Sequence, residues 1–158
     1  MLSLARRKLR ALARRPRFVR FWLMPICVLL GLGRVLVALL PFARLASFLG
    51  RRSPLDTPAP ALDTRQRRSA ELIRETLALG ARHTPWQSHC FAQALAARAL
   101  LALYRVPCVS YFGVARDAAS AGLEAHCWVV AGDLDVCGGA GQHRFTRVGC
   151  FLGGGHRC

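Results

Sequence analysis

The pattern of apolar and polar positions divides the chain into an apolar N-terminal part and a second part in which helical and strand patterns follow one another. Residues 21–43 are almost entirely apolar, and one charge, Arg34, interrupts them near the middle. A 3.6-residue apolar period then predicts a helix that begins at Asp63 or Thr64 and ends near Gly80. The first part is therefore hydrophobic on most sides, whereas the second has the amphipathic patterns of a globular domain.

A second helix and a group of short strands follow. Residues 93–103 are nearly all strong helix formers, and Pro107 ends their pattern. The predicted strands are residues 108–115, 123–131, 134–137 and 145–151, with Gly132 and Asp133 as a hairpin turn. Helices that precede hairpin-connected strands indicate an α+β fold, in which helices cover a small antiparallel sheet.

A proline-rich stretch separates the two parts. Residues 51–61 contain three prolines and the first acidic residue of the chain, which is a composition typical of a linker. We therefore expect residues 1–50 to form a basic, hydrophobic helical appendage. Residues 62–152 then form one domain, and residues 153–158 form a tail.

The net charge of +15 is concentrated near the N-terminus. Residues 1–55 carry twelve of the 23 basic residues and none of the eight acidic ones. Such a segment attracts nucleic acid, anionic lipid or an acidic protein. The basic residues flank an apolar run and do not interleave with aromatic residues on a polar face, so we expect no nucleic-acid partner.

Residues 18–49 allow three interpretations. A membrane-spanning helix needs about 20 apolar residues, and Arg34 near its centre would cost roughly 2.5–3.5 kcal/mol. A signal peptide would have basic residues before an apolar run, but no small-residue cleavage site follows Gly33. We favour helices that lie on a membrane surface or dock a partner, in a protein located in the cytoplasm.

The cysteine content argues against a disulfide scaffold. The chain has seven cysteines, an odd number, and no Cys-x-x-Cys pair, which favours reduced thiols. Five residues near the C-terminus could supply metal ligands in principle: Cys127, Cys137, Cys150, His156 and Cys158. None has the short paired spacing of structural zinc sites, so we expect no metal and no cofactor.

Two residues are candidates for nucleophilic chemistry. Cys90 opens the second predicted helix, with Ser88 as its N-cap. The partial positive charge at a helix N-terminus favours a thiolate over a thiol. His126 lies in the strand pattern of residues 123–131, where its imidazole can meet the thiol and act as base and then acid. A buried structural cysteine and a core histidine are the alternative interpretation.

The group that would orient His126 is less clear from the sequence. The expected cross-strand pairs are Ala131 with Leu134, Val130 with Asp135, Trp128 with Cys137 and His126 with Gly139. Asp135 is the candidate acid and Asp133 the alternative, but in this register Asp135 is roughly 13 Å from the level of His126. A carbonyl, a water or a glutamine could orient the imidazole instead. Trp86 and Gln93 are candidates for substrate binding, with helix or core packing as the alternative for both.

Three motifs together resemble a known family. They are Pro85-Trp86-Gln87-Ser88-His89-Cys90-Phe91-Ala92-Gln93-Ala94-Leu95, then Tyr111-Phe112-Gly113-Val114, then Leu123-Glu124-Ala125-His126-Cys127-Trp128-Val129. In this order they resemble the lasso-peptide leader peptidases, which are transglutaminase-like cysteine proteases related to the C-terminal domain of the microcin-processing B protein. The resemblance runs from roughly residue 60 to residue 151. It implies a transglutaminase- or papain-like core, with the catalytic cysteine at a helix N-terminus.

The resemblance also implies a function and partners. The protein would remove the leader from a ribosomal lasso-peptide precursor, before a separate asparagine-synthetase-like cyclase forms the macrolactam. The chain looks like the short, split form, which borrows leader binding from a separate leader-recognition protein. The family's orienting aspartate is expected where Gly138 and Gly139 stand. That departure favours one alternative, a catalytically degenerate, membrane-associated scaffold. Transglutaminase or amidase chemistry would use the same residues.

Overall fold

The computed structural model describes residues 13, 15–84, 90–116 and 122–154. Its helices are α2 (Arg17–Leu39), α3 (Phe42–Leu49), α4 (Thr64–His83) and α5 (Cys90–Leu103), with a short 3-10 helix, η1, at Gln142–Arg144. Its strands are β1 (Arg51–Arg52), β2 (Cys108–Arg116), β3 (Leu123–Ala131), β4 (Leu134–Cys137) and β5 (Thr146–Gly153). The predicted α+β class with a small antiparallel sheet is confirmed.

The sheet has the strand order β1-β5-β2-β3-β4, and neighbouring strands are antiparallel. Helices α4 and α5 cover one face, where α5 packs on β2 and β3 and α4 packs on β4. A second cluster, formed by Val109, Tyr111, Trp128, Phe145 and Cys150, lies on the opposite face. The sheet is therefore apolar on both faces, and within the described ranges the long helices cover only one of them.

The start of α4 is predicted correctly, but its end is not. Asp63 forms a capping box, because its side chain accepts a hydrogen bond from Gln66 N at 2.7 Å and its own amide donates to Gln66 Oε1 at 3.1 Å. The helix continues past Gly80 to His83. A Cβ at Gly80 would lie 2.7 Å from Cγ2 of Ile26, so this glycine allows α2 to approach and does not end the helix.

The predicted pairing of β3 with β4 is correct near the turn and wrong beyond it. Val130 pairs with Asp135, as expected, but Cys137 pairs with Val129 and not with Trp128. The reason is a bulge, which places one extra residue of β4 between these two pairs. β4 ends at Cys137, so the expected pairing of His126 with Gly139 does not form either.

The proline-rich stretch contains a strand that was not predicted. Arg51 and Arg52 form β1 and pair with Leu152 and Phe151 of β5. Further along, the carbonyl of Thr57 accepts a hydrogen bond from the Tyr111 hydroxyl at 2.7 Å. The segment between α3 and α4 is therefore attached to the edge of the sheet and to the face without helices.

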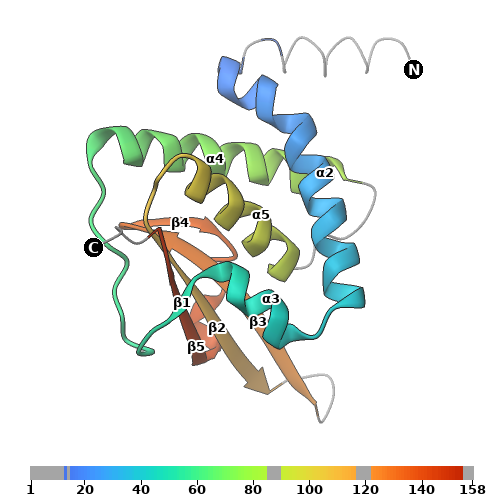
Figure 1. The fold of residues 1–158 in the computed structure, drawn as a ribbon, viewed down its shortest axis with the longest axis vertical. Helices are drawn as coiled ribbons and strands as arrows, with labels where there is room; N and C mark the ends of the chain where they lie inside the picture. The colour runs from blue at the N-terminus through green and yellow to red at the C-terminus, as the bar shows by residue number, and fades with distance from the viewer. Residues whose placement is uncertain (1–12, 14, 85–89, 117–121, 155–158) are drawn as a thin grey trace.

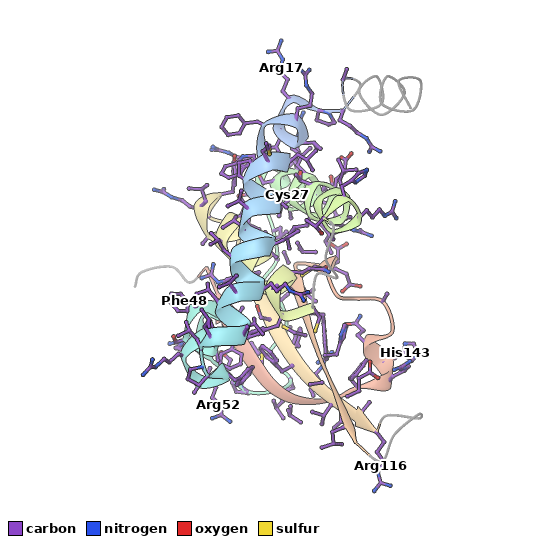
Figure 2. All side chains as sticks on the ribbon, turned by 90° about the vertical axis from the view of Figure 1, so that its right-hand side faces the viewer. Arg17, Cys27, Phe48, Arg52, Arg116 and His143 are labelled. Atoms are coloured by element: carbon purple, nitrogen blue, oxygen red, sulfur yellow. The ribbon has the colours of Figure 1, made fainter. Side chains whose placement is uncertain are left out.

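Helix α2 shares the core of the domain. Ile26 and Leu30 belong to the cluster between the helices and the sheet, and the Trp22 indole donates a hydrogen bond to the Tyr104 hydroxyl at 2.7 Å. A Cβ at Gly33 would lie 3.2 Å from Cα of Ala92 in α5, which is close backbone packing. By length and composition α2 could also cross a membrane, a test that core helices and signal sequences pass as well. Figure 2 shows α2 in front of the rest of the domain.

Candidate active site

Cys90 is the first residue of α5, at the end of the helix where partial positive charge gathers. It is half-buried and packs against the core between the helices and the sheet. Cys127 on β3 and Cys137 on β4 belong to that core, and burial raises the pKa of both thiols, that of Cys137 to about 12. Helix α5, which begins with Cys90, packs against both of these strands.

His126 has one ring nitrogen fixed by a hydrogen bond. Its Nε2 lies 2.7 Å from the carbonyl oxygen of Gly138. A carbonyl oxygen only accepts hydrogen bonds, so Nε2 carries the hydrogen and donates it. In the neutral imidazole, Nδ1 is then the nitrogen that can accept a proton.

Aromatic rings hold the imidazole from its sides. The His126 ring is stacked with Phe145 at 4.8 Å between centroids and with Trp128 at 6.0 Å, with interplanar angles of 26° and 23°. Gly113 pairs with His126 across β2 and β3, and a Cβ there would lie 2.7 Å from Cβ of Phe145. The absence of a side chain at this position lets Phe145 pack beside the histidine.

The two candidate catalytic residues lie on different faces of the sheet. His126 shares the face of Trp128, whereas Cys90 packs on the helix-covered face. Cys127 and Cys137, which are the sequence neighbours of His126 and of Gly138, belong to the cluster that Cys90 packs against.

Within the described chain, β4 pairs only with residues 129–131 of β3, so the part of β3 that carries His126 forms an edge on that side. Among the described residues, no hydrogen bond joins the Cys90 thiol to the His126 imidazole. Catalytic hydrogen bonds are often long in the absence of substrate. Direct contact between thiol and imidazole stays a prediction.

The two candidate orienting acids, Asp133 and Asp135, contact groups other than His126. Asp133 accepts a hydrogen bond from Arg67 at 2.6 Å, which lowers the pKa of this carboxyl group. The carboxyl group of Asp135 lies over the backbone of Gly139, where an added Cβ would collide with it. Neither carboxylate forms an ion pair with His126 in the described part of the chain. The roles of Asp135 and Asp133 stay predictions, and the Gly138 carbonyl makes the contact that an orienting group would make.

The structure describes one of the two substrate-binding candidates. Gln93 is half-buried, one turn after Cys90 on α5. Trp86 and the predicted cap Ser88 lie outside the described residues. Sequence reasoning missed Phe145, for which the aromatic residue after the glycine-rich segment was the available signal. A carbonyl was among the groups expected to orient His126, but the sequence did not indicate that it belongs to Gly138.

No group of three or more His, Cys, Asp or Glu side chains in the described ranges is placed to hold a metal ion. The thiols of Cys27, Cys90, Cys108, Cys127, Cys137 and Cys150 are free. The described residues therefore offer a free thiol at a helix N-terminus and, separately, an imidazole with one oriented ring nitrogen.

The chain belongs to the transglutaminase-like superfamily, whose model matches residues 35–150. Members of this superfamily are often cysteine proteases or transferases. The match includes α5 and all of the strands except the last residues of β5, and it confirms the predicted transglutaminase-like core. Comparison with curated proteins and with solved structures gives no match.

Proposed function

We propose that the protein is a cysteine peptidase that removes the leader from a ribosomal lasso-peptide precursor. The observation that carries the proposal is the placement of Cys90 at the N-terminus of α5, near the strand that carries a histidine with a fixed tautomer. The superfamily supports thiol chemistry. The substrate class rests on the resemblance of the motifs around Cys90 and His126 to those of the leader peptidases.

The proposed reaction is an acyl transfer in two steps. The thiolate of Cys90 attacks the scissile carbonyl carbon, and the carbon–nitrogen bond breaks as the His126 imidazolium gives its proton to the leaving amine. A water molecule then attacks the thioester and gives a proton to His126, the carbon–sulfur bond breaks, and the acid leaves as the thiolate and the imidazolium are restored. The Gly138 carbonyl holds Nε2–H throughout, so Nδ1 is the atom that takes and gives the proton.

The proposed partners follow from the same resemblance. The precursor's leader peptide would be presented by a separate leader-recognition protein, and the freed core would pass to an asparagine-synthetase-like cyclase. The thiols described as free suit a reducing cytoplasm.

The decisive experiment is cleavage of a precursor by the full chain together with its leader-recognition protein, followed by mass spectrometry. We expect cleavage by the natural protein and none by Cys90→Ala. Cys27→Ala is the matched control, because Cys27 is also free and half-buried but lies on α2. Cleavage retained in Cys90→Ala would eliminate the mechanism.

A degenerate scaffold is the second candidate. The observation that favours it is the lack of a hydrogen bond between Cys90 and His126 in the described part of the chain. A scaffold would leave the precursor uncleaved yet increase turnover by the cyclase, to the same extent with Cys90→Ala as without it. Transferase chemistry would appear as incorporation of an added amine into the acyl product.

A further inference from the structure

The outward face of α2 is mostly apolar, and Arg34 is the one exposed charge among residues 21–39. Its exposed side chains recur every three or four residues, which places them on one side of the helix. We call these residues the α2 stripe: Phe21, Met24, Val28, Leu32, Val35 and Leu39. Met24 is 77% exposed and Leu39 is 74% exposed. The stripe is about 27 Å long at 1.5 Å per residue, and monomeric soluble proteins seldom leave so long an apolar ridge in water.

The opposite side of α2 is fixed to the domain. Val19, Ile26, Leu30 and Gly33 are buried there, and Arg15 forms an ion pair with Glu75 of α4. The stripe is therefore not available for the protein's own core.

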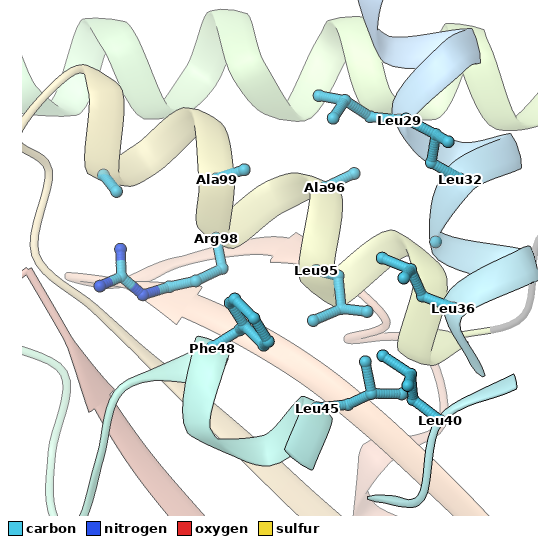
Figure 3. Close-up of a pocket in the computed structure, with 12 residues that line it drawn as sticks. Leu29, Leu32, Leu36, Leu40, Leu45, Phe48, Leu95, Ala96, Arg98 and Ala99 are labelled. Atoms are coloured by element: carbon cyan, nitrogen blue, oxygen red, sulfur yellow. The ribbon is translucent and has the colours of Figure 1, made fainter.

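The apolar surface continues beside the stripe. A groove of about 340 Å³ lies between α2, α3 and α5, and Leu32 and Leu36 of α2 form one of its walls. Figure 3 shows these two residues on α2, with Leu95 on α5 and Leu45 and Phe48 on α3. Phe48 is itself exposed. Stripe and groove together form one continuous apolar face.

Positive charge borders this face at both ends. Arg17 and Arg20 lie at the start of α2, and Arg44, Arg51 and Arg52 follow its end, all of them exposed. Figure 2 shows Arg17 and Arg52 at opposite ends of the side on which α2 lies in front. Residues 1–55 have no acidic residue that would repel an anionic surface. Apolar side chains in the middle and arginines at the margins match the acyl and headgroup layers of a bilayer.

An orientation in which α2 spans the membrane conflicts with the packing of α2 in the domain. α2 packs against α4 and α5, so a bilayer around α2 would also have to surround α4. The charged residues of α4 are Arg65, Arg67, Arg68, Glu71, Arg74, Glu75 and Arg82. Placing each of these charges at the centre of a bilayer would cost several kcal/mol. The helix can therefore lie in the interface without disturbing the domain, but it cannot cross the membrane with the domain intact.

We propose that the α2 stripe docks the folded protein on an anionic lipid bilayer, with α2 parallel to the membrane plane. The proposal does not depend on the reaction at Cys90. It places the catalytic domain on the membrane surface and leaves the opposite side of the molecule free for other proteins.

The test is flotation of the full chain with vesicles of phosphatidylcholine alone and with vesicles that also contain phosphatidylserine. We expect binding to the mixed vesicles that is about tenfold or more stronger and that weakens as salt rises. Met24→Gln combined with Val35→Gln should reduce binding by about tenfold, because it removes apolar contact area. The matched control is Leu55→Gln with Leu103→Gln, which changes two exposed leucines off the stripe and should leave binding unchanged.

A second variant measures how deeply α2 lies in the bilayer. Val28→Trp places a fluorophore in the middle of the stripe, and we expect quenching by lipids brominated near the headgroup and little by lipids brominated at the chain ends. Three results would overturn the proposal. They are equal binding by the stripe variant and its control, strong quenching from the bilayer centre, and a soluble dimer that the stripe substitutions dissociate.

Discussion

The Nε2 nitrogen of His126 lies 2.7 Å from the carbonyl oxygen of Gly138, at the edge of the sheet where β4 ends. A backbone carbonyl thus makes the contact that an aspartate makes in many catalytic triads. A carbonyl fixes the tautomer as a carboxylate does, but it brings no full negative charge to stabilise an imidazolium. This relationship leads to the first two predictions.

Gly138→Ala should impair cleavage more than it impairs folding. Gly138 has φ +73°, and an added Cβ would collide with the carbonyl oxygen of Cys127, so the backbone has to move and carry its own carbonyl away from His126. We expect at least a tenfold loss of kcat, on the scale of general acid–base contributions, at a temperature where the variant is folded.

The matched control for this change is Gly141→Ala. Gly141 has φ +77° but no atom within 4 Å of the added Cβ. It should lose roughly 1–2 kcal/mol of unfolding free energy from backbone strain alone and keep its kcat. Equal kcat in the two variants would show that the Gly138 carbonyl does not orient the histidine.

Asp135→Asn tests whether the Gly138 carbonyl or the Asp135 carboxylate orients His126. If Gly138 orients His126, the variant should cleave within about threefold of the natural rate, since the imidazole keeps its hydrogen bond. A loss on the order of 10⁴, as for the orienting aspartate of a serine protease, would assign the role to Asp135. Asp133→Asn is the parallel control, because it removes the ion pair with Arg67 at the neighbouring turn.

The buried thiols predict a loss of stability at alkaline pH. Burial raises the pKa of Cys108 to about 11 and that of Cys137 to about 12, from an ordinary value of 9.0. A pKa raised on folding contributes stability that is complete below pH 9 and is lost as the pH rises toward 11 and 12. Urea unfolding between pH 8 and pH 11 should show this decline.

Cys137→Ala is the variant that tests the source of the alkaline decline. It removes one thiol, so it should reduce the slope of unfolding free energy against pH above pH 9, whatever its own effect on stability at pH 8. An unchanged slope in this variant would place the alkaline decline elsewhere.

Gly80→Ala tests whether α2 is an integral part of the domain. The new Cβ would press against Ile26 of α2, and overpacking of this kind costs about 1–3 kcal/mol. Ile26→Ala by itself should cost about 2–5 kcal/mol. A double-mutant cycle by urea unfolding should show coupling of at least about 0.5 kcal/mol. Strict additivity would mean that α2 detaches before the domain unfolds.

Much of the fold could be predicted because local patterns determine it. The bounds of β3 and β4 follow from apolar runs around the Gly132–Asp133 turn, and the start of α4 follows from the chemistry of Asp63. The bulge in β4 could not be predicted, since one extra residue in a four-residue strand leaves no periodic signal. β1 was hidden for a related reason: two arginines in a proline-rich stretch form a strand only because β5 is there to pair with them.

The candidate site could likewise be predicted only in part. Cys90 and His126 could be singled out because a residue type at the start of a helix or within a strand pattern carries chemical meaning. The stacking of Phe145 on His126 depends on the path of the chain after β4, which is a long-range feature. A carbonyl could be named as one possible partner of His126, but not which carbonyl, because every residue has one.

The position of β5 has a consequence for biosynthesis. β5 lies between β1 and β2, although it emerges from the ribosome after every other strand. Until it inserts, β1 has no strand beside it, and Phe145, which directly precedes β5, is not held against the imidazole. The order of translation thus delays assembly of the histidine's surroundings until β5 has been made.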